Sequence, residues 1–283
     1  MEHRFGFRLV DAHHHLWEVG RSDLPWITPA IQSLARTFST TDLAGVFDGS
    51  GVERGVLVQS GMSDADNALI DEWSRETDHI AGVVAWADIA GNRLDGQLDA
   101  LCRNPKVVGI RLQAEDSPDD GLFDHPEVVR GLRRLADRGL TYDFLVRVPQ
   151  LRSVPKVYGQ VPNLKGVIDH MAKPDIANGQ GLKEWEDALR AAAAVPGLHC
   201  KLSGQLALAG PNPTAEKLKP YVQLAIEIFG VDRVMWGSDW PVATLAADYA
   251  TTLTTMREAM GDLSSADEEK IFRTNAMRFY GLS

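Results

Sequence analysis

Short apolar runs that alternate with helical segments constrain the fold of this chain more than any other feature. The runs are rich in valine, leucine and isoleucine and lack strict apolar–polar alternation, which is typical of parallel strands covered on both faces. Eight candidate strands are Arg8–Ala12, Arg54–Gln59, Ile80–Trp86, Val107–Arg111, Thr141–Arg147, Gly166–Asp169, His199–Leu202 and Arg233–Trp236. These runs predict a parallel sheet.

Segments with helical periodicity lie between the apolar runs. Pro126–Ala136 carries its apolar residues on one face, and proline suits a first helical turn. Thr214–Phe229 carries a similar stripe and is followed by Gly230, a typical residue for ending a helix. Near the end of the chain, Ser265 with Glu268 has the spacing of a capping box, which predicts another helix start.

Eight strands that alternate with helices favour a single-domain (β/α)8 barrel over residues 1–283. Such barrels take about 250 residues, so the 283 residues of this chain suffice for one. The alternative is a doubly wound open sheet, which has the same alternation of elements. The sequence contains no Gly/Ser-rich linker and no internal repeat that would divide the chain.

The charge and cysteine content exclude several classes of function. With 29 Lys and Arg against 39 Asp and Glu, the net charge of -10 disfavours binding to nucleic acids and to anionic membranes. Two cysteines are too few for a disulfide framework. The first ten residues lack the apolar core of a signal peptide, and no run approaches the roughly 18 apolar residues of a membrane span. We therefore expect a cytoplasmic protein.

Two histidines follow the first predicted strand, and a barrel builds its chemistry at the carboxyl ends of its strands. His13 and His15 are two residues apart on an extended segment, so their side chains point to the same side, whereas His14 points away. Two imidazoles that converge in this way can hold a divalent cation or polarise an oxygen. A lone histidine would more often serve a structural role.

A third histidine and an aspartate follow later strands. His170 ends the sixth predicted strand, and Asp239 follows the eighth, two residues after Gly237, which allows the backbone to approach closely. A carboxylate that faces imidazoles across the barrel mouth can act as a general base for water. The structural alternatives are a polar residue under a loop for His170 and a helix cap for Asp239.

Arg111 ends the fourth predicted strand and can present a bidentate fork to an oxygen-rich substrate. The alternative is an ion pair with Glu115, Asp116 or Asp169. Gln59 and Arg147 occupy equivalent positions after the second and fifth strands, so we expect them at the substrate as well.

Four tryptophans lie close to predicted strand ends, namely Trp17, Trp26, Trp86 and Trp240. Trp26 and Trp240 offer flat apolar faces that suit a sugar or an aromatic ring. Core packing is the alternative for both residues, and it accounts for Trp73 and Trp185 on predicted helices.

Taken together, these motifs resemble the amidohydrolase superfamily, and within it the lactonases that act on sugar-acid lactones and on pyrone dicarboxylates. The motifs are Asp11-Ala12-His13-His14-His15, Gly109-Ile110-Arg111, Asp169-His170 with Lys173-Pro174, Lys201-Leu202-Ser203-Gly204 and Gly237-Ser238-Asp239-Trp240-Pro241. They follow the family order along nearly the whole chain. The resemblance implies a distorted (β/α)8 barrel whose mouth hydrolyses an ester or amide.

The sequence departs from the members of the superfamily that bind two metal ions. Those members carry a bridging lysine or glutamate on the fourth strand and a histidine on the fifth, whereas this chain has Arg111 on the fourth strand and no histidine on the fifth. The resemblance therefore implies that His13, His15, His170 and Asp239 either hold one divalent cation, with zinc the first candidate, or act without a metal. We expect no organic cofactor.

The resemblance implies hydrolysis of an aldonolactone such as L-fucono-, L-rhamnono- or galactonolactone. Asp239 would activate water, while the three histidines, or an ion held by them, would stabilise the oxyanion. Three alternatives remain open: a lactonase for pyrone or muconolactone dicarboxylates, a zinc-dependent decarboxylase, and a non-catalytic carbohydrate-binding barrel. We expect a small-molecule lactone as the partner, and the sequence does not indicate an oligomeric state.

Overall fold

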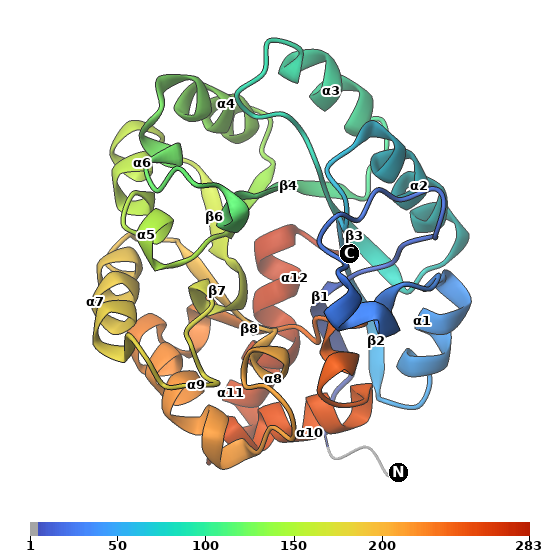
Figure 1. The fold of residues 1–283 in the computed structure, drawn as a ribbon, viewed down its shortest axis with the longest axis vertical. Coiled ribbons are helices and arrows are strands. Elements are labelled where there is room, and N and C mark those ends of the chain that lie inside the picture. The colour runs from blue at the N-terminus through green and yellow to red at the C-terminus, as the bar shows by residue number, and fades with distance from the viewer. Residues whose placement is uncertain (1–4) are drawn as a thin grey trace.

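The computed structural model describes residues 5–283, within which eight parallel strands lie side by side in chain order (Figure 1). The strands are β1 (Leu9–His14), β2 (Val52–Val58), β3 (Ile80–Ala85), β4 (Val107–Gln113), β5 (Thr141–Leu145), β6 (Lys165–Ile168), β7 (His199–Leu202) and β8 (Val234–Trp236). Each strand starts and ends within two residues of the corresponding strand predicted from the sequence.

The last strand meets the first just beyond its carboxyl end. His14 and Trp240 form a parallel bridge, and the His15 amide donates a hydrogen bond of 2.7 Å to the Trp240 carbonyl oxygen. The Asp239 amide donates to the His13 carbonyl oxygen at 2.8 Å. These bonds bring the two ends of the sheet together into a nearly closed barrel. The predicted (β/α)8 barrel is confirmed, and the open-sheet alternative is wrong.

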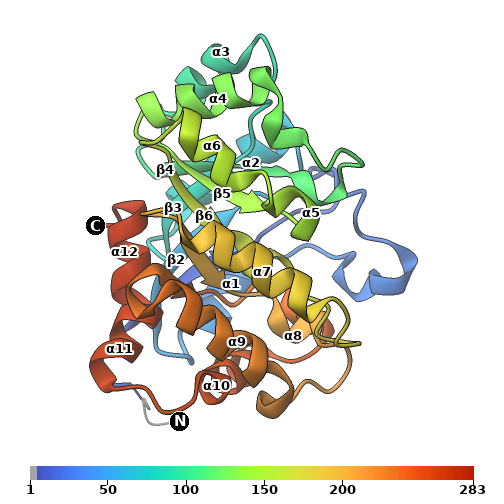
Figure 2. The ribbon, with the colours of Figure 1, turned by 90° about the vertical axis from the view of Figure 1, so that its left-hand side faces the viewer.

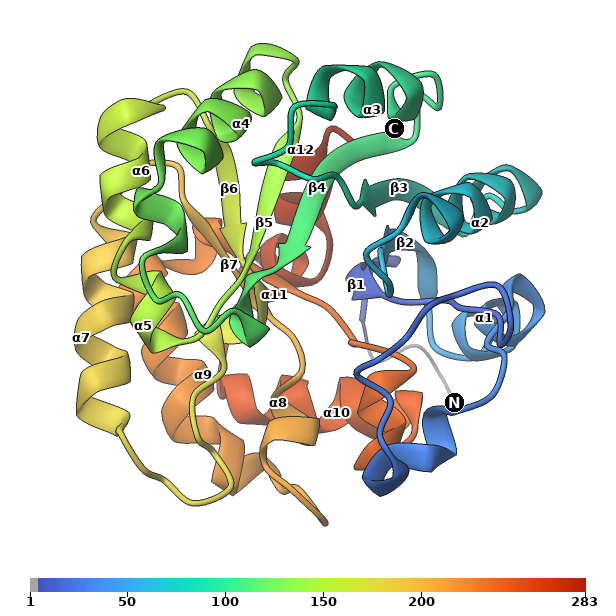
Figure 3. The same ribbon diagram turned by 45° about the horizontal axis from the view of Figure 1, so that its top comes forward.

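Helices surround the strands (Figure 3). They are α1 (Thr40–Phe47), α2 (Asp64–Glu76), α3 (Leu94–Leu101), α4 (Pro126–Asp137), α5 (Val148–Leu151), α6 (Val154–Gln160), α7 (Leu182–Ala193), α8 (Gln205–Leu208), α9 (Ala215–Phe229), α10 (Tyr249–Met260), α11 (Ser265–Glu269) and α12 (Asn275–Tyr280). Among the described helices, none is long and apolar enough to cross a membrane.

The helix ends follow the local sequence, with one correction. The side chain of Thr214 caps α9, and Gly230 ends it, as predicted. The predicted cap of α11 is one residue off, because Ser264 rather than Ser265 accepts the hydrogen bond from the Asp267 amide. Two adjacent serines, each followed three residues later by an acidic residue, make the two caps equivalent in the sequence.

Helix α12 closes one end of the barrel. Valines of β1, β2, β3 and β6 form a buried cluster with Phe279 and Tyr280 of this helix. Figure 2 shows α12 at the end of the barrel opposite the long segment that joins β1 to α1. With one end packed by apolar side chains, polar side chains at the carboxyl ends of the strands face the other end.

Candidate active site

A cavity of about 220 Å³ lies at the carboxyl ends of the strands. Its lining residues are His15, Trp26, Ser60, Arg111, Gln113, Glu115, Leu145, His170, Lys173, Asp239 and Val242. A larger hollow of about 770 Å³ lies on the outside of the barrel between α2 and α3, but its described lining residues include no histidine. The smaller cavity is therefore the better candidate for a site of chemistry.

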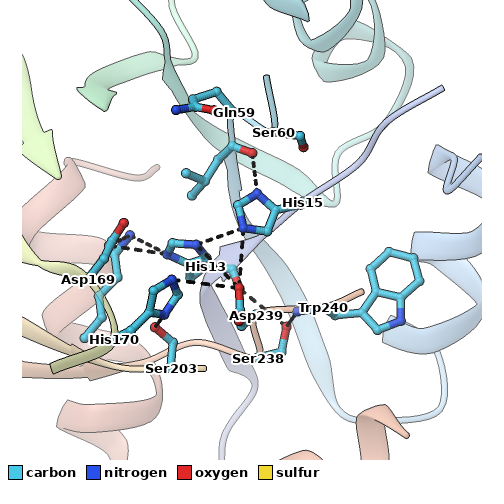
Figure 4. A network of polar contacts seen from close by, with 12 residues as sticks. His13, His15, Gln59, Ser60, Asp169, His170, Ser203, Ser238, Asp239 and Trp240 are labelled. Atoms are coloured by element: carbon cyan, nitrogen blue, oxygen red, sulfur yellow. Dashed lines mark hydrogen bonds and ion pairs between the residues drawn. The ribbon is translucent and has the colours of Figure 1, made fainter. Parts of the chain in front are cut away.

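The carboxyl end of β1 and the residue after it supply two imidazoles, on His13 and His15, whose Nε2 atoms lie 3.1 Å apart (Figure 4). His13 is fully buried beneath the cavity, whereas His15 lines it. The Nδ1 atom of His15 lies 2.8 Å from the Val58 carbonyl oxygen. Because a carbonyl only accepts, this contact places the proton on Nδ1 and leaves Nε2 with a lone pair.

A left-handed turn after β6 places His170 in the cavity. Four consecutive non-glycine residues, from His170 to Lys173, have φ between 52° and 58°. Such residues are rare in this region because the Cβ atom crowds the following carbonyl oxygen. The imidazole is held by Ser203, whose Oγ lies 2.9 Å from Nδ1. Strain of this kind clusters at functional sites, where the surrounding structure compensates for it.

Asp239 lies at the centre of the three imidazoles (Figure 4). Its Oδ1 lies 3.4 Å from Nε2 of His15, 3.8 Å from Nε2 of His13 and 4.0 Å from Nε2 of His170. The residue itself has a left-handed φ of 58°. Gly237 allows this approach, since a Cβ atom there would lie 2.6 Å from the Cβ of His13. The close backbone approach predicted at Gly237 is confirmed.

The electrostatics of the cluster favour a charged Asp239 beside neutral His13 and His170. Burial alone raises the pKa of Asp239, but electrostatic attraction to the imidazole of His170 and the contact with His15 outweigh burial, so that the pKa of Asp239 lies below its usual value of 3.8. Burial lowers the pKa of His170 below 6.5, and burial together with the nearby Lys201 charge lowers the pKa of His13 well below 6.5. Near neutral pH, Asp239 is therefore ready to accept a proton.

The donor atoms of the cluster also fit a divalent cation. One ligand atom from each of His13, His170 and Asp239 can be chosen so that all three lie within 4.8 Å of one another. The Nδ1 atom of His13 lies 3.4 Å from Oδ1 of Asp169, and that of His170 lies beside Ser203. The Ser203 hydroxyl is the kind of outer hydrogen-bond partner that orients a metal-binding histidine.

Comparison with known proteins identifies the family of this chain. An amidohydrolase family model matches residues 10–282. A relative from Burkholderia ambifaria, an L-fucono-1,5-lactonase, is 34% identical over 275 residues, covering 96% of this chain and 94% of the relative. The chain belongs to the amidohydrolase family. The resemblance that the sequence motifs indicate is thereby confirmed.

Two further amidohydrolase relatives bear on the site. A crystal structure of an amidohydrolase from Burkholderia multivorans with bound zinc matches this chain with a TM-score of 0.90 at 31% identity, covering 98% of this chain and 100% of that one. A 2-pyrone-4,6-dicarboxylate hydrolase from Comamonas testosteroni is 26% identical over 242 residues, covering 82% of this chain and 76% of that protein.

Arg111 of this amidohydrolase lines the cavity, where it was predicted to contact the substrate. It also forms the ion pair with Asp169 that was one of the alternatives to a substrate contact. Its Nη1 lies 3.1 Å from Oδ2 of Asp169, and its Nη2 donates to the Gln59 carbonyl oxygen at 2.6 Å. Glu115 pairs with Lys173 instead, and the side chain of Asp116 lies outside the described part of the structure. Arg111 therefore has few free donors for a substrate.

The other predicted substrate contacts lie at different distances from the cavity. Trp26 lines it and donates its indole N–H to the Ser60 carbonyl oxygen at 2.9 Å. Gln59 is buried next to the cavity, whereas Arg147 is exposed at the start of α5 and is not among the lining residues. Trp240 is buried and points away from the imidazoles (Figure 4).

A network of buried charged residues lies beneath the cavity of the amidohydrolase, and the sequence patterns predict little of it. Lys201 is fully buried, and its Nζ lies 2.5 Å from Oδ2 of Asp143 and 3.1 Å from Oδ1 of Asp169. The hydroxyl of Tyr280 donates to the same Asp143 oxygen at 2.8 Å. The available signal was a charged residue in the middle of each of two apolar strands, since such residues need partners when they face inward.

Proposed function

We propose that this amidohydrolase hydrolyses a sugar-acid lactone and that Asp239 activates the attacking water. The observation that carries the proposal is the position of the Asp239 carboxylate, which lies within 4.0 Å of three imidazole Nε2 atoms beside a small cavity. A water in the cavity next to this carboxylate can lose its proton to Asp239 as it attacks a carbonyl carbon.

The relatives support a lactone as the substrate. The Burkholderia ambifaria protein, which aligns with nearly the whole of this chain, is an L-fucono-1,5-lactonase. The cavity of about 220 Å³ is smaller than the roughly 300–1,000 Å³ of pockets for drug-sized ligands, so it suits a compact, single-ring substrate. The ring of Trp26 offers an apolar face, and Ser60 and Gln113 bring polar groups for hydroxyls.

Asp239 and His170 have separate roles in the reaction. Asp239 takes a proton from water, and the resulting hydroxide adds to the lactone carbonyl carbon. Ser203 can donate its hydroxyl hydrogen to Nδ1 of His170, and that tautomer carries its ring proton on Nε2, from which it can stabilise the oxyanion. When the ring C–O bond breaks, protonated Asp239 returns the proton to the alkoxide leaving group.

We further propose that His13, His170 and Asp239 hold one divalent cation, with zinc the first candidate because a related amidohydrolase contains zinc. Such a cation would supply Lewis-acid stabilisation of the charge that develops on the carbonyl oxygen. To hold an ion, His170 would take its other tautomer, in which Nδ1 donates to the Ser203 hydroxyl oxygen and Nε2 keeps a lone pair for the ion.

The proposal is tested by following acid release with a pH indicator while purified protein is mixed with L-fucono-1,5-lactone, L-rhamnono-1,4-lactone or D-galactono-1,4-lactone. We expect turnover of at least one of these uncharged lactones, well above the spontaneous rate. Acid release no faster than the spontaneous rate with all three lactones would contradict the proposed function.

A further inference from the structure

An ion pair forms one wall of the cavity. Glu115 follows β4, Lys173 ends the left-handed turn after β6, and their side chains meet at the cavity, where 11% of the Glu115 side chain and 21% of the Lys173 side chain are exposed. Neither has another ion-pair partner among the described side chains. The pair thus lies between two segments that are distant in sequence.

The backbone fixes the position of Lys173. Its φ of 52° continues the left-handed turn, and its amide donates to the His170 carbonyl oxygen at 2.9 Å. His170 itself lies beside Asp239, so the turn places the ammonium group near the proposed base.

The charges that line the cavity cancel in pairs. Arg111 is neutralised from behind by Asp169, and Lys173 is neutralised by Glu115. Asp239 is the remaining charged group among the described lining residues, and it is negative. A substrate carboxylate would therefore find no unpaired cationic side chain among the described lining residues of the cavity.

We propose that the Glu115–Lys173 ion pair makes the cavity selective for uncharged, hydroxyl-bearing lactones and excludes lactones that carry carboxylates. Glu115 is the residue that determines specificity, because it occupies the ammonium group that would otherwise bind a substrate carboxylate. The ammonium group of Lys173 carries three N–H donors, and these can still bind hydroxyl groups while its charge is paired with Glu115. This inference rests on the proposed function, since it concerns the choice of substrate at the same cavity.

The test measures the binding of benzene-1,3-dicarboxylate, a flat dianion that cannot be hydrolysed, by calorimetry. Glu115→Gln keeps the shape of the side chain but frees Lys173, so we expect the dianion to bind about tenfold more tightly than to the wild type. Lys173→Met leaves Glu115 unpaired at the cavity, and we expect about tenfold weaker binding. Glu227→Gln, which breaks an exposed ion pair with Arg190 on the helical surface, serves as the matched control.

The double variant Glu115→Gln/Lys173→Met shows whether the tighter binding of the dianion in Glu115→Gln arises from Lys173. We expect its affinity to return to within about twofold of the wild type. Dianion binding that is unchanged in both single variants, or equally tight in Glu115→Gln and the double variant, would overturn the inference. Circular dichroism verifies that each variant is folded, and Lys173→Met carries the test alone if Glu115→Gln fails to fold.

Because binding requires no turnover, the inference and the proposed function can fail separately. If the wild type opens no neutral lactone but the affinities shift as expected, the proposed function is wrong and the role of the ion pair stands. If the wild type opens L-fucono-1,5-lactone and Glu115→Gln binds the dianion no better, the inference alone is wrong.

Discussion

The ammonium Nζ of Lys201 lies 3.1 Å from Nδ1 of His13, in a position that water does not reach. The contact joins the buried charge network to the histidine cluster above it. Asp169 belongs to both, because it approaches Nδ1 of His13 and also pairs with Lys201 and Arg111. The orientation of His13 is therefore set from below by charged residues that do not line the cavity.

Removing Lys201 should be costly for stability. Lys201→Met leaves Asp143 and Asp169 buried with one cationic partner fewer, and breaking a buried pair in this way costs about 3–5 kcal/mol. The free energy of unfolding from urea titrations measures the cost. The double variant Asp143→Asn/Lys201→Met should lose less than the sum of the single losses, because the neutral amide no longer needs the ammonium. Additive losses within about 0.5 kcal/mol would show that the pair is not coupled.

The stability of the protein should depend on pH through His14, which is buried and whose two ring nitrogens have no hydrogen-bond partner in the described structure. Burial lowers its pKa from 6.5 to about 3. As the pH falls below 6.5, the unfolded chain binds a proton at His14 whereas the folded protein does not until about pH 3. The contribution of His14 to stability is therefore present above pH 6.5 and is lost in this window, by about 1.4 kcal/mol per pH unit.

His14→Leu isolates this contribution. Relative to the wild type, the variant should gain about 2 kcal/mol in free energy of unfolding between pH 7 and pH 5. His125→Leu is the matched control, because the hydrogen bond with Asp119 raises the pKa of the exposed His125. Its stability relative to the wild type should change in the opposite direction. A difference between His14→Leu and the wild type that stays constant with pH would contradict a neutral buried His14.

Zinc should bind to the histidine cluster with a stoichiometry of one. We expect calorimetry of metal-free protein to show one site, and saturation at about 100 times the Kd should raise the free energy of unfolding by about 2.7 kcal/mol. His170→Asn removes one proposed ligand and should weaken binding at least about tenfold. His125→Asn, at an exposed histidine, should leave the affinity unchanged. Equal weakening in both variants would indicate that zinc does not bind at the cluster.

The barrel and the centre of the site could be predicted because both depend on patterns that are local in the sequence. Apolar runs and helix ends show the strands and their alternation with helices. In a barrel, the carboxyl ends of all strands meet, so residues as distant in sequence as His13, His170 and Asp239 could be expected to converge. The structure does bring these three side chains together.

The ion pairs could not be predicted in the same way, because they depend on register and on unusual backbone conformation. Three acidic residues were equivalent partners for Arg111, and the register of the strands selects Asp169. Lys173 meets Glu115 through a left-handed turn of non-glycine residues, for which the sequence gives no signal. Position alone was also misleading for Arg147. It was expected at the substrate because it follows a strand, but it lies exposed at the start of α5.

Replacing the proposed base tests the central claim most directly. Asp239→Asn keeps the side-chain shape but cannot accept the proton of water, and Asp187→Asn on the exposed face of α7 is the control. With L-fucono-1,5-lactone as substrate, we expect kcat to fall by about 10²–10⁴ in Asp239→Asn, with little change in KM, and to be unaffected in the control. Hydrolysis by Asp239→Asn at a kcat within about threefold of an active wild type would contradict the role of Asp239 as the base.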